Sequence, residues 1–160
     1  RGTTRGAELE WQARLAPALR WSGHLGWLDA RYGEYIDGSG NDVAAGRHFP
    51  NAPRRTAGTS LVADLPLGGK GWLLARLDGR YQGETWPTTD LEPRLRQGGY
   101  AVWNASLAWT SPQRRWELAL RVDNIGDTAY RTTGFAYQTG VVIGYYGPPR
   151  SYAMTLGWSF

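Results

Sequence analysis

The 160-residue sequence contains no cysteine, so a disulfide framework and a thiolate metal site are both excluded. It has two histidines, His24 and His48, and neither stands in an HExxH or a GxSxG arrangement. No run of about twenty apolar residues exists, which excludes a transmembrane helix. Glycine and proline interrupt every segment, so helix signals are almost absent. We therefore predict a protein without helical core, cofactor, bound metal or enzymatic activity.

The charge balance argues against a nucleic-acid partner. The formal net charge is +4, and all of the 18 basic residues except Lys70 are arginines. These arginines are scattered along the chain and form no run or helical stripe. The length suits one ordinary domain.

The aromatic residues point to a boundary between oil and water. Nine tryptophans and nine tyrosines stand against three phenylalanines, and Trp and Tyr carry an apolar body with a polar tip. The mean hydropathy of -0.49 is compatible with a membrane β-barrel, because only alternate residues of such a barrel face lipid.

Alternation of apolar and polar residues recurs along the whole chain and predicts seven strands. Each is about as long as a tilted strand that crosses a bilayer. The predicted strands cover residues 6–14, 19–32, 55–65, 72–81, 100–110, 116–130 and 152–160.

The connections alternate between short and long. Tight turns are expected at 15–18, 66–70 and 111–114, whereas the stretches 33–54, 82–99 and 131–149 are long and rich in Gly, Asn, Asp and Pro. Short turns at one end and long loops at the other are typical of an outer-membrane barrel. A soluble sandwich has no reason to sort its connections in this way.

The two predicted faces differ in character. Two aromatic girdles are expected on the apolar face, one near the tight turns (Trp21, Trp109, Trp116, Trp158 and Phe160) and one near the long loops (Trp27, Tyr81, Trp103, Tyr130 and Tyr152). Charged residues fill the other face, as in a wide barrel with a watery or plugged lumen: Glu8, Glu10, Arg14, Arg20, Arg76, Asp78, Arg80, Glu117, Arg121 and Asp123.

Seven antiparallel strands cannot close into a barrel, and an open edge in lipid leaves backbone groups unpaired. An eighth strand would have to lie in 131–149, where Pro148 and Pro149 make it awkward. We therefore expect these residues to be part of a larger barrel whose other strands precede them.

Two stretches, WELALRVDNIGDTAYRTTGF and YYGPPRSYAMTLGWSF, resemble the C-terminal end of a TonB-dependent outer-membrane receptor. The family's Asn-Leu-Phe-Asp-x-x-Tyr segment is matched by Asn124, Asp127 and Tyr130, with Gly126 in place of Phe. Its Gly-x-Pro-Arg segment is matched by the residues Gly147, Pro149 and Arg150. The terminal barrel-assembly signal is matched by Tyr152, Leu156, Trp158 and Phe160, although Thr155 replaces the usual glycine.

The resemblance implies that residues 1–160 supply about seven C-terminal strands of a barrel with about 22 strands. It implies energised import of a scarce nutrient, with a ferric siderophore as the expected cargo. The plug domain, the upstream strands and the segment that binds TonB would precede Arg1. Expected partners are outer-membrane lipid, lipopolysaccharide, the protein's own plug, TonB, the barrel-assembly machinery and a metal-chelate ligand.

Arginine guanidinium groups form paired hydrogen bonds with carboxylate, hydroxamate and catecholate oxygens, and aromatic rings pack on the apolar surface of a ligand. The candidate ligand-binding residues of the loops are Tyr35, Arg47, His48, Trp86, Arg94, Arg96, Tyr137, Tyr145 and Tyr146. The lumen arginines Arg76, Arg80 and Arg121 could steer anionic ligands, although we expect them to pair with Asp78, Asp123 or the plug. Two alternatives remain open here: a small non-transporting outer-membrane barrel or adhesin, and a soluble carbohydrate-binding β-sandwich.

Overall fold

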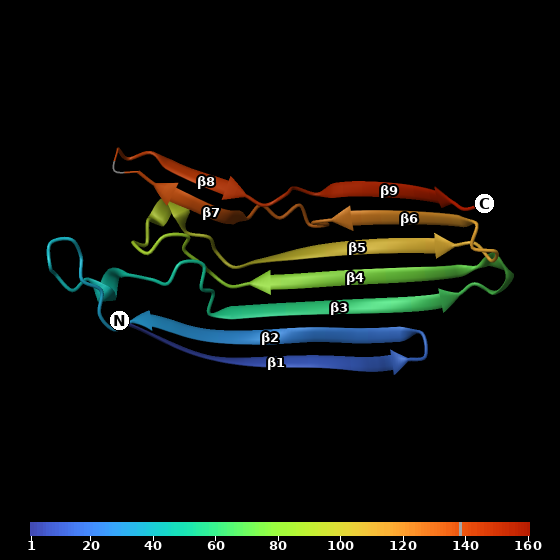
Figure 1. Cartoon of the computed structure of the whole chain (residues 1–160), viewed down its shortest axis with the longest axis horizontal. Helices are drawn as coiled ribbons and strands as arrows, with labels where there is room; N and C mark the ends of the chain where they lie inside the picture. Colours follow the sequence, from blue (N-terminus) through green and yellow to red (C-terminus); the bar gives the residue numbers. More distant parts are fainter. Residues whose placement is uncertain (138) are drawn as a thin grey trace.

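The computed structural model describes residues 1–137 and 139–160, which are almost entirely antiparallel β-strand. Seven strands form one sheet in the order β1-β2-β3-β4-β5-β6-β9, and β7 pairs with β8 in a separate two-stranded sheet (Figure 1). Three short 3-10 helices, η1 (Ala44–Gly46), η2 (Gly68–Lys70) and η3 (Pro93–Leu95), lie in the connections. No helix in the described ranges is both long and apolar enough to cross a membrane.

The predicted seven-stranded wall is confirmed, and most of its boundaries agree with the sequence pattern. The strands of this sheet are β1 (Gly2–Ala16), β2 (Leu19–Tyr32), β3 (Arg55–Pro66), β4 (Trp72–Gln82), β5 (Tyr100–Thr110), β6 (Trp116–Asp123) and β9 (Ser151–Trp158).

The sixth strand is shorter than predicted, because the chain turns at Asn124. Asn124 and Asp127 adopt left-handed backbone conformations (φ 52 and 49), and the Asp127 amide donates to the Asn124 carbonyl over 2.8 Å. A left-handed residue breaks the strand geometry. The assignment of Tyr130 to the apolar girdle is therefore wrong: its side chain is buried and stacks on Tyr100, with ring centroids 4.6 Å apart.

The long connection after β6 also differs from the prediction. It contains the hairpin β7 (Arg131–Ala136) and β8 (Val142–Tyr146), which joins no strand of the main sheet. Pro148 and Pro149 follow β8 and separate it from β9, where a strand would otherwise continue.

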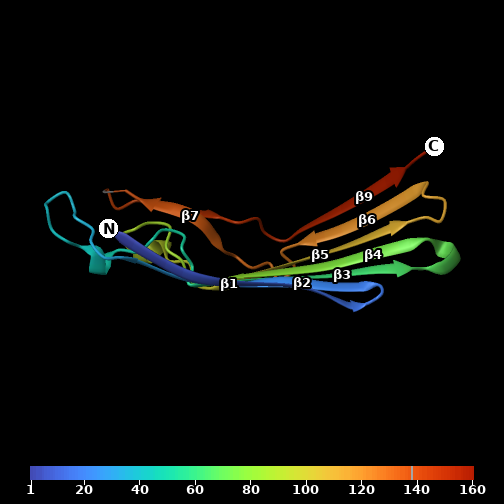
Figure 2. The same ribbon diagram turned by 60° about the horizontal axis from the view of Figure 1, so that its bottom comes forward.

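Tight turns gather at one end of the sheet and long loops at the other (Figures 1 and 2). The C-terminus lies at the tight-turn end, whereas the N-terminus and the β7–β8 hairpin lie at the long-loop end. The long-loop end also contains the one fully buried large side chain of the described residues, Leu95.

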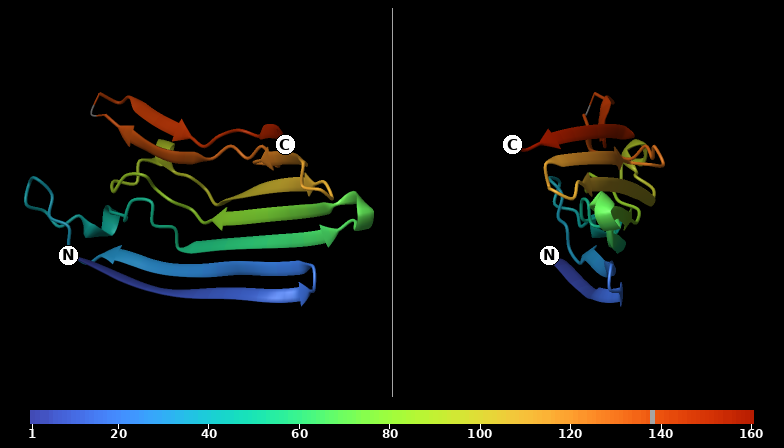
Figure 3. Two further views of the ribbon diagram at one scale, coloured as in Figure 1. Left: turned by 45° about the vertical axis from the view of Figure 1, so that its right-hand side comes forward. Right: turned by 90° about the vertical axis from the view of Figure 1, so that its right-hand side faces the viewer.

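The strand register separates the two faces as the alternation predicts. One face, the apolar face, carries a band of exposed leucines and Met154 across the middle of the sheet: Leu25, Leu61, Leu77, Leu107, Leu120 and Met154. The opposite, polar face carries the charged residues. The view along the strands in Figure 3 shows the sheet as an arc that does not close, with β1 and β9 at its two edges.

Candidate functional site

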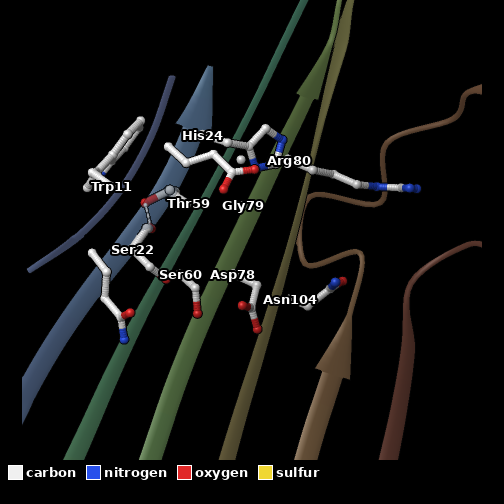
Figure 4. Close-up of a pocket in the computed structure, with 13 residues that line it drawn as sticks. Trp11, Ser22, His24, Thr59, Ser60, Asp78, Gly79, Arg80 and Asn104 are labelled. Atoms are coloured by element: carbon white, nitrogen blue, oxygen red, sulfur yellow. Dashed lines mark hydrogen bonds between the residues drawn. The ribbon is translucent and has the colours of Figure 1, made fainter. Parts of the chain in front are cut away.

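The polar face carries a hollow of ≈ 590 Å³ that spans strands β1 to β5 (Figure 4). In its upper row Glu10 lies opposite His24, His24 opposite Gly58, and Gly58 opposite Arg80. The His24 imidazole lies directly over Gly58, and a Cβ at Gly58 would overlap that ring. Glycine at this position therefore lets a histidine lie flat on the floor of the hollow.

The next row of the hollow holds hydroxyl, carboxylate and amide groups. Ser22, Ser60, Asp78 and Asn104 follow one another across four strands. The Asn104 side chain accepts a hydrogen bond from the Asn124 amide over 2.8 Å, which connects the hollow to the turn after β6. This row offers many hydrogen-bond donors and acceptors, so it suits polar groups of a ligand or of a protein segment.

Two of the three lumen arginines are paired within their own strand, as the sequence indicated. Arg76 donates to both oxygens of Asp78 over 2.7 and 2.8 Å, and Arg121 Nε lies 2.8 Å from Asp123. Arg80 behaves differently, because its Nη2 donates to the Tyr130 hydroxyl over 2.9 Å. Among the described residues Arg80 has no ion-pair partner and so keeps a positive charge on the polar face.

The loop arginines Arg94 and Arg96 hold the long loops together. Arg94 donates to Glu92 over 2.7 Å and to the Gly140 carbonyl over 2.9 Å, so it ties 82–99 to 131–149. Arg96 Nε donates to Glu84 over 2.8 Å. The hydrogen bonds from Arg94 lower the pKa of Glu92 below its ordinary value. The role of Arg94 and Arg96 in ligand binding stays a prediction. The contacts that these two arginines make in the structure are with other loop residues.

Arg131 is the loop residue that sequence reasoning missed. Its amide donates to the Gln97 side chain over 2.6 Å, Nη1 donates to the Arg96 carbonyl over 3.1 Å, and Nη2 donates to the Tyr146 hydroxyl over 3.2 Å. Arg131 thus organises two loops that lie more than thirty residues apart in sequence. No periodic signal marks it, and only its place next to Tyr130 could have drawn attention.

The remaining loop candidates fall into separate groups. Arg47 lies over the Tyr35 ring, with 5.5 Å from Cζ to the centroid, and Tyr35 packs edge-on against Tyr32 at 5.1 Å. His48 and Trp86 line a second hollow of ≈ 330 Å³. Backbone hydrogen bonds from the His48 amide to Thr89 and from the Asn51 amide to Trp86 join the loops 33–54 and 82–99. Tyr137, Tyr145 and Tyr146 are exposed on the β7–β8 hairpin.

The turn of DGSGND resembles the start of a calcium loop, but backbone amides bind one oxygen of each aspartate. The Asp37 carboxylate accepts from the Ser39 and Asn41 amides, and the Asp42 carboxylate accepts from Tyr35 and Ala44, at 2.9 to 3.0 Å. These amides lower the pKa of both carboxyls. No cluster of three or more acidic or histidine residues that could hold a metal ion lies in the described ranges.

The six motif residues near the C-terminus come together in one structure, which we term the Asn124 clasp (Asn124, Asp127, Tyr130, Gly147, Pro149 and Arg150). The side chain of the buried Asn124 donates from Nδ2 to the carbonyls of Thr128 and Pro148 over 3.0 and 3.1 Å. Asp127 accepts from the Arg150 amide over 2.9 Å.

Tyr130 completes the clasp by covering Gly147. A Cβ at Gly147 would overlap the Tyr130 ring, and the Gly147 amide donates to the Tyr130 carbonyl over 2.9 Å. The clasp therefore sets the point at which the chain leaves the loops and enters β9.

The residues of the predicted barrel-assembly signal lie along the apolar face at the edge of the sheet. Tyr152, Leu156, Trp158 and Phe160 are all exposed, and Trp158 stacks on Trp116 of β6 with centroids 5.9 Å apart. Whether these residues act as an assembly signal stays a prediction.

The chain matches a known family over most of its length. Residues 1–125 match the family model described as TonB dependent receptor-like, beta-barrel. The pesticin receptors of Yersinia enterocolitica and Yersinia pestis are 33% identical to it over 132 residues, which are 81% of this chain and 18% of each relative. The chain thus spans less than a fifth of the length of these relatives.

Solved structures support the same assignment. The ferric yersiniabactin uptake receptor FyuA from Yersinia pestis aligns with 99% of this chain and 24% of its own, at 28% identity and a TM-score of 0.81. The ferric-catecholate import receptor Fiu from Escherichia coli K12 shares the fold, with a TM-score of 0.71 at 20% identity over 99% of this chain and 21% of its own. These comparisons give no support to the soluble sandwich or to the small barrel and adhesin.

Proposed function

Because the chain belongs to the TonB-dependent receptors and forms part of an outer-membrane β-barrel, we propose that the whole protein imports a ferric siderophore. The observation that carries the proposal is the alignment of nearly the full chain with the receptor for ferric yersiniabactin uptake. The family is one of transport receptors rather than enzymes.

The long-loop end supplies groups that suit capture of such a chelate. Exposed rings of Tyr137, Tyr145 and Tyr146 would cover apolar parts of the ligand. Arg47 would attract its anionic oxygens. The hollow on the polar face, with Arg80 forming no ion pair among the described residues, would lie on the inward path of the chelate. The iron in this scheme is cargo that the chelator brings.

Further partners are proposed on the same basis. The polar face would pack against the protein's own plug domain, and the two free edges would pair with the other barrel strands. TonB would supply energy through the plug, and the assembly machinery would read β9. The apolar face would contact lipid and lipopolysaccharide. Family membership and the chemistry of the sheet faces and edges support these proposals.

The test is iron uptake by the full-length receptor in cells that lack other siderophore receptors. Radioactive iron would be offered as hydroxamate, catecholate and phenolate chelates. We expect uptake from one class, lost in cells without TonB. Uptake from none of the classes, with the receptor folded in the outer membrane, would overturn the proposal.

A variant pair tests the capture surface. We expect Arg47→Ala to raise the chelate concentration for half-maximal uptake about tenfold, as for loss of a charged hydrogen bond. Arg115→Ala, an exposed arginine at the tight-turn end, is the matched control and should change nothing. Equal effects of the two variants would show that Arg47 does not belong to the capture surface.

A further inference from the structure

The apolar face changes character at the long-loop end of strands β1 to β3. A tilted strand needs about 9–11 residues to cross the hydrocarbon layer. Eleven residues counted from the tight-turn ends of these strands reach Gly6, Asp29 and Thr56. Below these levels, towards the tight turns, this face of the three strands carries no charged residue, and Asp29 at the boundary is the first. A charge is costly at the bilayer centre and nearly free at the interface.

Three arginines follow within one or two residues of those levels, on the same face. Arg5 lies opposite Asp29 in the β1–β2 register, and Arg55 lies opposite Trp27 in the β2–β3 register. Arg31 is two residues beyond Asp29 on β2, and its Nε lies 2.8 Å from the Asp29 carboxylate. All three therefore lie next to Asp29: Arg5 is directly opposite, Arg55 is diagonal to it, and Arg31 is on the same strand. We term Arg5, Arg31 and Arg55 the arginine cluster.

The cluster is accessible and carries excess positive charge. Its three cations are balanced by Asp29 alone, and Arg5 and Arg55 form no ion pair with any residue that the structure describes. The Arg31 side chain keeps 71% of its exposure despite its ion pair. A hollow of ≈ 340 Å³ opens at Arg5 and Arg31 and is lined by Thr3, Arg5, Asp29, Arg31, Tyr32 and Gly33, whereas Arg55 lies outside this lining.

The level below the cluster has the chemistry of a membrane interface. Trp27 and Ala7 lie opposite each other one step further into the sheet, and Trp27 is 45% exposed. Tryptophan rings favour the headgroup level. A ligand at the cluster would thus place its anionic part among guanidinium groups and its acyl part along the apolar face.

We propose that the arginine cluster binds the phosphate headgroup of lipopolysaccharide in the outer leaflet. Guanidinium forks match phosphate oxygens in a bidentate way and stay charged at any pH of the cell surface. The long-loop end of an outer-membrane barrel faces outward, so the outer-leaflet glycolipid is the phosphate carrier at this level. The inference requires the membrane location but not the identity of the transported chelate.

The experiment uses the full-length receptor, purified in detergent and stripped of lipid. Binding of lipid A would be followed by native mass spectrometry for the wild type, for the triple variant R5A/R31A/R55A, and for Arg115→Ala as a control that removes one arginine outside the cluster. We expect about a fivefold loss of affinity per arginine removed, the size of one basic residue near an anionic membrane surface. The control should bind as the wild type does.

Single variants keep the test decisive if the triple variant misfolds. If the triple variant does not form a heat-modifiable barrel, Arg5→Gln and Arg55→Gln should each weaken lipid A binding about fivefold. Wild-type binding by these variants would overturn the proposal. Inorganic phosphate and phosphatidylglycerol form the comparison arms. Displacement of lipid A by inorganic phosphate at equal concentration would show a free-phosphate site and would also overturn it.

Discussion

At the scale of single residues, the Asn124 clasp shows why particular side chains occur near the C-terminus. Asn124 is 3% exposed, adopts a left-handed conformation and satisfies three backbone groups: it donates to Thr128 and Pro148 and accepts from the Thr128 amide. Asparagine tolerates this conformation better than most residues and brings both donor and acceptor. No other side chain of this size does all three.

Replacement of this asparagine tests the clasp. We expect Asn124→Ala to lower the unfolding free energy of the full-length receptor by about 1–3 kcal/mol, because buried backbone groups lose their partners. Urea unfolding in detergent, followed by tryptophan fluorescence, would measure the change. Asn124→Asp, which keeps the acceptor but sets a buried carboxylate against the Thr128 and Pro148 carbonyls, should destabilise at least as much, and Gln113→Ala in the exposed turn should be neutral. A neutral Asn124→Ala would contradict the assigned role.

Asp37 makes the stability of the loop 33–54 depend on pH. The folded pKa of Asp37 lies below its ordinary value, because the Asn41 and Ser39 amides stabilise the carboxylate. The stabilisation is therefore complete above about pH 3.9, the ordinary value, and is lost as the pH falls through the lower folded value. Hydrogen exchange of the Ser39 and Asn41 amides, corrected for intrinsic rate, should speed up in that range. Asp37→Asn should remove the pH dependence, and its persistence would exclude Asp37 as the cause.

At the scale of elements, the long loops behave as a small packed unit above the sheet. Leu95 of η3 is fully buried, and a Cβ on Gly134 of β7 would come within 2.6 Å of the Leu95 Cδ2. Arg94 and Arg131 add hydrogen bonds between the same loops. The unit is thus held by one apolar anchor and a set of arginine contacts.

Removal of the anchor should loosen the loops and spare the wall. We expect Leu95→Ala to weaken the packing of the β7–β8 hairpin by about 2–5 kcal/mol, the range for a buried leucine. Limited proteolysis of the full-length receptor should then cleave 131–149 faster, whereas heat-modifiability of the barrel should not change. Leu67→Ala, an exposed leucine in a tight turn, is the control. Unchanged proteolysis would show that the arginine contacts alone hold the hairpin.

At the scale of the whole molecule, the described residues form an open wall with exposed surfaces on both sides. Three large apolar side chains are buried among them, Leu95, Val102 and Tyr130. The edges of β1 and β9 are not paired with each other. In lipid, each unpaired backbone group on such an edge costs several kcal/mol.

This architecture leads to a prediction for the 160-residue chain produced alone. We expect it to give unfolded or aggregated material in detergent, since neither edge has a partner and the polar face has no plug to cover it. Electrophoresis with and without heating, together with trypsin digestion, measures this. The full-length receptor, prepared in parallel, should show a heat-modifiable, resistant band. The same band from the isolated chain would contradict the prediction.

The alternation of residue types by itself determined the seven strands of the wall, apart from the end of the sixth, together with the two faces and the sorting of short and long connections. These features are local, because a period of two depends only on neighbours along the chain. Tertiary structure decided where the irregular segments go. Tyr130 is buried against Arg80, fifty residues away, and Arg94 binds the Gly140 carbonyl at a separation of 46. Such pairings depend on how the strands bring distant loops together, so no local pattern could predict them.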